Sequence, residues 1–268
     1  VAGKTPHIIS ISGNTYGIAY TGDGDDGFLK TVQILTDGTI GDAVIDSLEF
    51  DTMTGKTPNI TPISGNVYAI VYTGDVYAGS VVTIEVAANG QITDTVIDSD
   101  IFDTVKGNTP RLIPISGDIY AVAYSGDDDD GMLKTFTIST AGVIADEGEP
   151  EESYDFDSLE YDLLMGKTPS IIQIDDSVYA VAYAGDGDDG FLVTLDISST
   201  GPIADSIIDS LEYDSVKGKT PDIIHVSGTT YAIAYSGDGD VGKLVSIDIQ
   251  TDGSIGAAVI DSLQFVSS

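Results

Sequence analysis

The stretch Tyr231-Ala-Ile-Ala-Tyr235 decides the fold class of this chain. Successive side chains of a β-strand point to opposite faces, so the bulky residues of this stretch point one way and the alanines the other. Both faces are apolar, which indicates a strand that is covered on both sides. The same alternation recurs at 68–72, 120–124 and 179–183. The chain is therefore built around a repeated strand that neighbouring sheets cover.

A repeat of 52 residues runs through the whole chain. Its most constant mark is a Thr-Pro pair, and successive pairs are separated by 52, 52, 59 and 52 residues. The longer interval contains a seven-residue acidic insertion at 147–153, for which a solvated loop is our default prediction. The pairs are Thr5-Pro6, Thr57-Pro58, Thr109-Pro110, Thr168-Pro169 and Thr220-Pro221.

The first repeat contains four strand signals and no helical periodicity. Apolar and β-branched runs at 7–12, 15–20, 28–34 and 43–50 are separated by Gly, Asn and Asp. The pair Asp37-Gly38 is a typical hairpin turn. Four strands per repeat predict an all-β protein.

The ends of the chain favour a closed ring over an open solenoid. A solenoid needs atypical polar repeats at its ends, because a terminal face is otherwise exposed. Here the first and last repeats are among the most regular. We therefore predict a closed five-bladed β-propeller with four antiparallel strands per blade. It forms a single domain over 1–268, with blades at approximately 1–52, 53–104, 105–163, 164–215 and 216–268.

The blade layout resembles the kelch and integrin-type propeller repeats, and the blade count is similar to that of the tachylectin-type lectins. The likeness lies in the order of inner strand, Gly turn, Tyr-Ala-rich strand, Gly-Asp loop, third strand and outer strand. The kelch double glycine and Trp are missing, as is the spacing of the integrin calcium loop. The resemblance implies that the Gly-Asp loops and the blade-to-blade connections share one rim, and it transfers no functional residue.

Charge and composition exclude several classes of partner. The chain has 44 acidic and 10 basic residues, a formal net charge of −34, so electrostatic binding to nucleic acid or anionic membrane is excluded. Cations, neutral glycans and basic proteins are permitted, and an acidic surface also serves solubility. Without cysteine there is no disulfide or thiolate chemistry. No apolar run is long enough to insert into a membrane. Because Val1 falls mid-repeat, we expect a piece of a larger chain or assembly.

The Gly-Asp loops are candidate calcium sites, because Ca²⁺ takes six to eight oxygen ligands in adaptable geometry. The alternative is a tight solvated loop, which the turn chemistry of Asp and Gly explains without a metal. No EF-hand is present, and blade 2 departs from the pattern with Asp75-Val-Tyr-Ala. No cofactor is required by the sequence. The candidate carboxylates are Asp23, Asp25, Asp26, Asp127, Asp129, Asp130, Asp186, Asp188, Asp189, Asp238 and Asp240.

One polar position directly after each Thr-Pro pair varies fully while its neighbours stay constant. It opens the innermost strand, so we predict that five polar side chains ring the mouth of a central channel and form a ligand pocket. The alternative is an exposed strand end that tolerates most residues. The adjoining Gly-Lys-Thr is not a phosphate loop, because it leads through Pro into a strand. The five residues are His7, Asn59, Arg111, Ser170 and Asp222.

These observations lead to three functional hypotheses. The first is a non-catalytic extracellular or cell-surface module that binds a glycan or protein partner through repeated sites. The second is a structural subunit of a surface layer or filament. The third is a glycoside hydrolase, which needs two carboxylates facing each other at the channel mouth. We expect no enzyme, because blades this alike offer few unique residues, with two His and one Arg in the chain.

Overall fold

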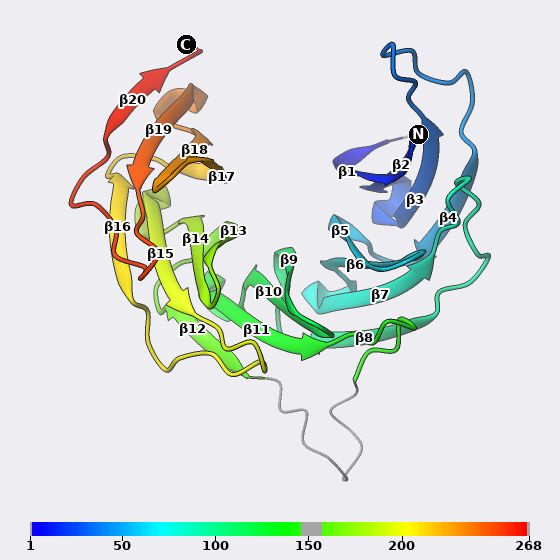
Figure 1. The fold of residues 1–268 in the computed structure, drawn as a ribbon, viewed down its shortest axis with the longest axis horizontal. Coiled ribbons are helices and arrows are strands. Elements are labelled where there is room, and N and C mark those ends of the chain that lie inside the picture. Colours follow the sequence, from blue (N-terminus) through cyan, green and yellow to red (C-terminus); the bar gives the residue numbers. More distant parts are fainter. Residues whose placement is uncertain (1, 146–156, 267–268) are drawn as a thin grey trace. The chain divides into compact units, whose positions relative to one another are not determined.

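The computed structural model describes residues 2–145 and 157–266, and it confirms an all-β protein of five four-stranded antiparallel sheets (Figure 1). Within each sheet the four strands are neighbours in chain order, so each repeat forms one propeller blade. None of the helices in the described ranges is long and apolar enough to cross a membrane. The acidic insertion at 147–153 lies outside the described residues.

Blades 1 to 5 have the following strands. Blade 1 contains β1 (Lys4–Ser12), β2 (Thr15–Thr21), β3 (Gly27–Gln33) and β4 (Asp46–Asp51). Blade 2 contains β5 (Lys56–Ser64), β6 (Val67–Thr73), β7 (Gly79–Glu85) and β8 (Asp98–Asp103). Blade 3 contains β9 (Asn108–Ser116), β10 (Ile119–Ser125), β11 (Gly131–Thr137) and β12 (Ser158–Asp162). Blade 4 contains β13 (Lys167–Asp175), β14 (Val178–Ala184), β15 (Gly190–Asp196) and β16 (Asp209–Asp214), and blade 5 contains β17 (Lys219–Ser227), β18 (Thr230–Ser236), β19 (Gly242–Asp248) and β20 (Asp261–Gln264).

Each Gly-Asp loop forms a short 3₁₀ turn between the second and third strands of its blade. The turns are η1 (Asp23–Asp25), η2 (Asp75–Tyr77), η3 (Asp127–Asp129), η4 (Asp186–Asp188) and η5 (Asp238–Asp240). Three residues are too few to show a periodicity, so the sequence predicts a loop here without its helical turn.

Two compact units make up the chain. One consists of Val1–Pro114 and Phe136–Asp155, and the other of Ile115–Thr135 and Phe156–Ser268. Blades 1 and 2 belong to the first unit and blades 4 and 5 to the second. Closure of the ring and the single domain over 1–268 stay predictions.

Neighbouring blades pack a bulky face onto a small face. In the first unit, Ile70 and Tyr72 of β6 join a buried cluster with Ala19 and Leu29 of blade 1. In the second unit, Ile233 and Tyr235 of β18 lie in one cluster with Ala180, Ala182 and Leu192 of blade 4. This confirms the packing predicted from the alternation of bulky and small residues. Ile233 is fully buried, and replacing such a residue by Ala costs about 2–5 kcal/mol.

Buried hydrogen bonds also join the blades. The Thr31 hydroxyl donates to the Gly90 carbonyl at 2.6 Å, and the Ile92 N–H donates to Asp46 at 2.9 Å. The second unit repeats both bonds, with Thr194 donating to Gly253 at 2.6 Å and Ile255 to Asp209 at 2.8 Å. Because polar groups buried here are paired, the register between blades is fixed as well as their packing.

The glycine of the Gly-Lys-Thr-Pro segment allows two backbone segments to pass close to each other. A Cβ on Gly55 would lie 2.3 Å from the Cα of Gly27, and the Gly55 N–H donates to the Asp25 carbonyl at 2.7 Å. A side chain has no room where two backbones cross this closely. This contact explains the segment without a phosphate ligand.

Candidate functional site

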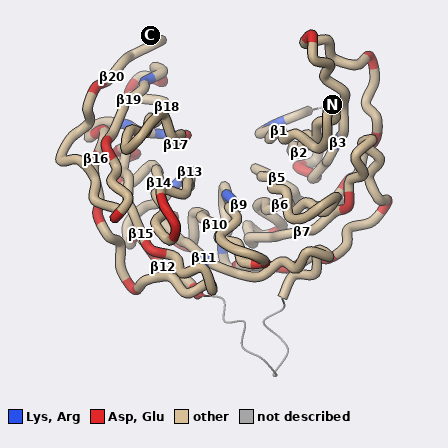
Figure 2. Tube along the Cα trace, viewed as in Figure 1, with Lys and Arg blue, Asp and Glu red and all other residues tan. Residues whose placement is uncertain are grey.

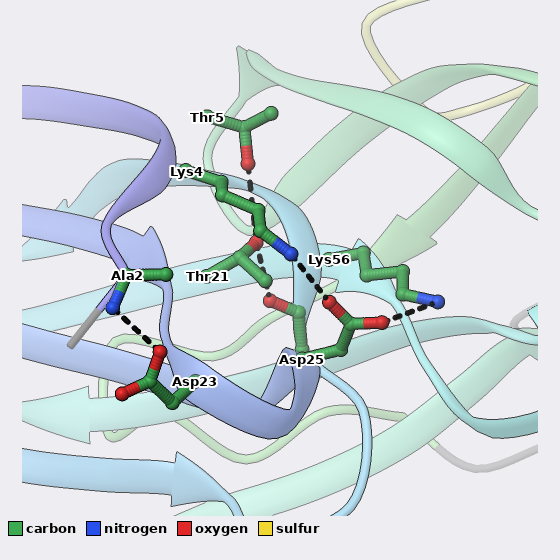
Figure 3. Close-up of polar contacts among 8 residues, drawn as sticks. Ala2, Lys4, Thr5, Thr21, Asp23, Asp25 and Lys56 are labelled. Atoms are coloured by element: carbon green, nitrogen blue, oxygen red, sulfur yellow. Dashed lines mark hydrogen bonds and ion pairs between the residues drawn. The ribbon is translucent and has the colours of Figure 1, made fainter.

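The Gly-Asp loop and the starts of two inner strands meet on one rim of the first unit (Figure 3). Lys4 at the start of β1 places its Nζ 3.2 Å from Asp25 Oδ1, and Lys56 at the start of β5 places its Nζ 3.0 Å from Oδ2 of the same residue. The Thr21 hydroxyl donates to the Gly55 carbonyl at 3.0 Å and lies 3.1 Å from the Thr5 hydroxyl. Residues far apart in sequence therefore build one polar rim.

Asp25 is held as a carboxylate by two lysines. Its hydrogen bonds to Lys56 and then to Lys4 lower its pKa below the ordinary value for Asp. The three side chains are between 37% and 60% exposed, so solvent screens both ion pairs strongly. These contacts position the loop more than they stabilise the fold.

The second unit repeats this arrangement. Lys167 at the start of β13 lies 3.1 Å from Asp129. Lys219 at the start of β17 lies 4.0 Å from Asp188 and 3.7 Å from Asp240. The aspartates engaged by these lysines belong to the predicted calcium set. In the described part of the chain, no group of three or more His, Asp or Glu side chains is arranged to hold a metal ion.

Charge on the surface is as uneven as the composition implies. Figure 2 shows many acidic and few basic residues along the chain. Lysines at the starts of inner strands each face at least one carboxylate of the rim. The rim therefore combines localised ion pairs with a wider acidic surface.

In the first unit, two of the variable inner-strand residues accept hydrogen bonds from the backbone of the next blade. His7 Nδ1 accepts a hydrogen bond from the Ile60 N–H at 3.1 Å. Asn59 Oδ1 accepts one from the Leu112 N–H at 3.0 Å. Asn59 is 6% exposed, so it is a buried link between inner strands. Arg111 is half-buried and donates from Nη1 to the Pro110 carbonyl at 3.0 Å.

In the second unit, the same position leaves a carboxylate exposed. Ser170 Oγ accepts from the Ile223 N–H at 3.3 Å and donates to Asp222 Oδ1 at 3.2 Å. Ser170 is 8% exposed, whereas Asp222 is exposed on β17. The structure thus brings together His7 with Asn59, and Ser170 with Asp222. Asp222 has both an orienting hydrogen bond and access to solvent.

A second set of aspartates, at the ends of the outer strands, was not predicted from the sequence. Asp51 Oδ2 accepts from the Tyr72 hydroxyl at 3.0 Å, and Asp214 Oδ2 accepts from the Tyr235 hydroxyl at 2.9 Å. Burial, reinforced by the neighbouring aspartate, raises the pKa of both tyrosines far above the ordinary value. The recurrence of Asp at the start and end of a six-residue outer strand was the signal that could have found them.

The solved structures similar to this chain include a xylanase, a glycoside hydrolase and a gluconolactonase. A Bacteroides thetaiotaomicron endo-1,4-β-xylanase is 14% identical, with a TM-score of 0.53 and coverage of 96% of this chain and 95% of that chain. A thermostable family-43 glycoside hydrolase is 12% identical, with a TM-score of 0.52 and coverage of 99% and 95%. The Pseudomonas aeruginosa periplasmic gluconolactonase PpgL is 12% identical, with a TM-score of 0.50 and coverage of 94% and 82%. No family model and no curated protein matches the chain.

These similarities overturn two of our predictions. The chain was expected to be a non-catalytic binding and display module, and not an enzyme, whereas the similar propellers are glycoside hydrolases and a lactonase. The error came from treating near-identical blades as equivalent. The residue at the inner-strand position differs from blade to blade: Asn59 and Ser170 link their strand to the next one, while Asp222 is exposed on β17, which no further inner strand follows within its unit.

Proposed function

We propose that this chain is the propeller of an extracellular or cell-surface glycoside hydrolase that cleaves a neutral polysaccharide. The observation that carries the proposal is the exposed Asp222 carboxylate, oriented by Ser170, on an inner strand of a propeller. Similar propellers include a xylanase and a family-43 glycoside hydrolase, which supports a glycosidic substrate.

Glycosidic bond cleavage uses two carboxyl groups, one that protonates the leaving oxygen and one that activates water or attacks the sugar. We assign the first role to Asp222, whose Oδ1 is fixed by Ser170 while the side chain remains open to solvent. The second role needs an ionised carboxylate and is assigned to Asp188 or Asp240, the two rim aspartates that lie beside Lys219. Both belong to the same unit as Asp222.

The charge of the chain supports a neutral substrate. A formal net charge of −34 repels anionic polymers, including nucleic acids and acidic polysaccharides. A neutral glycan pays no such penalty and is recognised by hydrogen bonds and ring stacking. A polysaccharide too large to enter a cell is consistent with a location outside it, and the similar lactonase is periplasmic.

We also propose that Ca²⁺ binds to loop carboxylates other than those paired with lysine above, such as Asp23 and Asp26, and that the fold does not require it. Oxygen-rich loops suit this ion. We expect millimolar Ca²⁺ to raise the melting temperature by a few degrees and EDTA to reverse the change, since a ligand that binds only the folded state stabilises it. An unchanged melting temperature removes calcium from the account.

The hydrolase proposal is tested by incubating the chain with xylan, an aryl β-xyloside and glucono-1,5-lactone and measuring reducing ends or acid release. We expect Asp222→Asn to lower the rate of glycoside hydrolysis at least about a hundredfold, as removal of a catalytic acid or base does. The matched control is Asp175→Asn, at the far end of inner strand β13. Hydrolysis of the lactone alone, or equal rates for the wild type and Asp222→Asn, contradicts the proposal.

A further inference from the structure

The Gly-Asp loop of blade 2 has lost the residues that suit its conformation. Four loops place Gly or Asp at the second position of the turn and Asp at the third. Blade 2 has Val76 and Tyr77 instead. Both residues adopt the left-handed region, with φ of 52° and 71°. A β-branched residue is a pronounced outlier there, whereas Gly24, Gly187 and Gly239 occupy the position without strain.

Packing within the fold does not account for this choice. Val76 is 78% exposed and Tyr77 is 60% exposed. Val76 and Tyr77 therefore stand in solvent on a strained backbone, which distinguishes them from other exposed hydrophobic residues such as Met53 and Leu164, whose φ is not positive. A residue pair that costs stability and buries little points to a role in binding.

The loop lies at the end of the blade where the variable polar residues begin the inner strands. The Tyr77 carbonyl accepts from the Gly107 N–H at 2.8 Å, and Gly107 directly precedes β9, which carries Arg111. Across blade 2, Lys56 pairs with Thr73 and Asn59 pairs with Val71, so β5 begins beside this loop. Tyr77 therefore belongs to the same rim as the polar groups of the first unit.

We infer that Val76 and Tyr77 form a platform on which a sugar ring of a neutral polysaccharide stacks. This inference rests on the proposed function and names a second contact for its substrate. The face of a tyrosine ring is apolar and electron-rich, while its hydroxyl remains in water, which suits the C–H face and hydroxyls of a pyranose. Tyr contributes large contact area at low conformational cost, as in other recognition surfaces. The aspartate of the other loops offers no such face.

The test compares loop variants by affinity electrophoresis in gels containing xylan. Tyr77→Ala and the double variant Val76→Gly/Tyr77→Asp, which restores the loop sequence of blades 1, 4 and 5, are each expected to weaken retardation about tenfold. Tyr77→Phe keeps the ring and should stay within about twofold of wild type. The double variant relieves backbone strain, so its melting temperature should equal or exceed that of wild type.

Several results overturn the inference. One is that the double variant is retarded as strongly as the wild type. Another is that its melting temperature falls together with its binding, because Val76 and Tyr77 then have a structural role. Absence of wild-type retardation also overturns it, as does an oligomer that dissociates in the double variant, since the patch then binds a second copy. Asp175→Asn, the control at the far end of β13, should be retarded like wild type. If the wild type is retarded by xylan but does not hydrolyse it, the hydrolase proposal is contradicted and the inferred platform is not.

Discussion

Asn59 of blade 2 and Asp222 of blade 5 occupy the same position of the repeat and differ in burial. Asn59 is 6% exposed and accepts a backbone hydrogen bond from Leu112 in the next inner strand. Asp222 is exposed, and Ser170 of the preceding inner strand donates to its carboxylate. The same position therefore links two inner strands where a further strand follows within the unit, and is exposed on β17, which no further inner strand follows within its unit.

Near-identical repeats therefore need not carry equivalent sites. The framework around the variable position is constant, so a buried side chain there is constrained to satisfy a backbone N–H. An exposed side chain at the same position is free of that demand. Function can then reside in one blade while the others maintain the scaffold.

Of changes at Asn59 and Asp222, removal of the buried Asn59 side chain is expected to lower the stability of the fold most. Asn59→Ala leaves the Leu112 N–H without its acceptor, which costs about 1–3 kcal/mol. For a chain of this size the melting temperature should fall by several degrees, roughly 2–4 °C per kcal/mol. Calorimetry measures the change. Asn89→Ala, at an exposed turn of the same blade, is the control, and equal shifts for the two variants would break the comparison.

Replacing Ser170 is expected to have a smaller effect on stability and a second effect on catalysis, because Ser170 both links two inner strands and orients Asp222. Ser170→Ala removes the acceptor of the Ile223 N–H and the donor to Asp222. We expect a loss of about 1 kcal/mol in the free energy of unfolding. The rate of xylan hydrolysis should fall several-fold through a lower kcat, because the carboxylate loses its orientation. Thermal melts measure the loss of stability, and steady-state kinetics measure the loss of rate. An unchanged kcat would show that Ser170 only links strands.

Most of the fold could be predicted from the sequence, because the repeat makes local patterns unambiguous. The Thr-Pro spacing predicted the blades, and the alternation in Tyr231-Ala-Ile-Ala-Tyr235 predicted that bulky faces pack on small ones. The short 3₁₀ turns and the left-handed threonines, such as Thr5 with φ of 46°, were not predicted. Thr5 lies where Lys4 pairs with Thr21 and the register shifts before His7, and this pairing of two strands has no local signal in the sequence.

Closure of the ring stays a prediction. Ile60 of β5 is 1% exposed beneath its neighbours, while its counterpart Ile8 in β1 is 51% exposed. At the other end of the chain, Phe265 is 56% exposed, whereas its counterpart Phe50 is 8% exposed. These are the apolar surfaces that closure predicts to be covered.

The candidate site could be predicted only in part. The variable position was recognisable because its neighbours are constant, yet the sequence could not separate Asn59 from Asp222. Burial of a strand residue depends on the adjoining blade, which is distant in sequence. The lysine partners of Asp25 begin inner strands of two different blades, and the strained Val76-Tyr77 pair was visible only as a departure from the loop pattern.

The most direct test of the account exchanges the two residues. In the double variant Asn59→Asp/Asp222→Asn the carboxylate moves from the exposed position to the buried one, with little change in size or in net charge. We expect xylan hydrolysis to stay at the background level of Asp222→Asn, because the reaction depends on the surroundings of residue 222. Recovery of hydrolysis in the exchanged variant would contradict it, since the inner-strand positions would then be interchangeable members of one pocket.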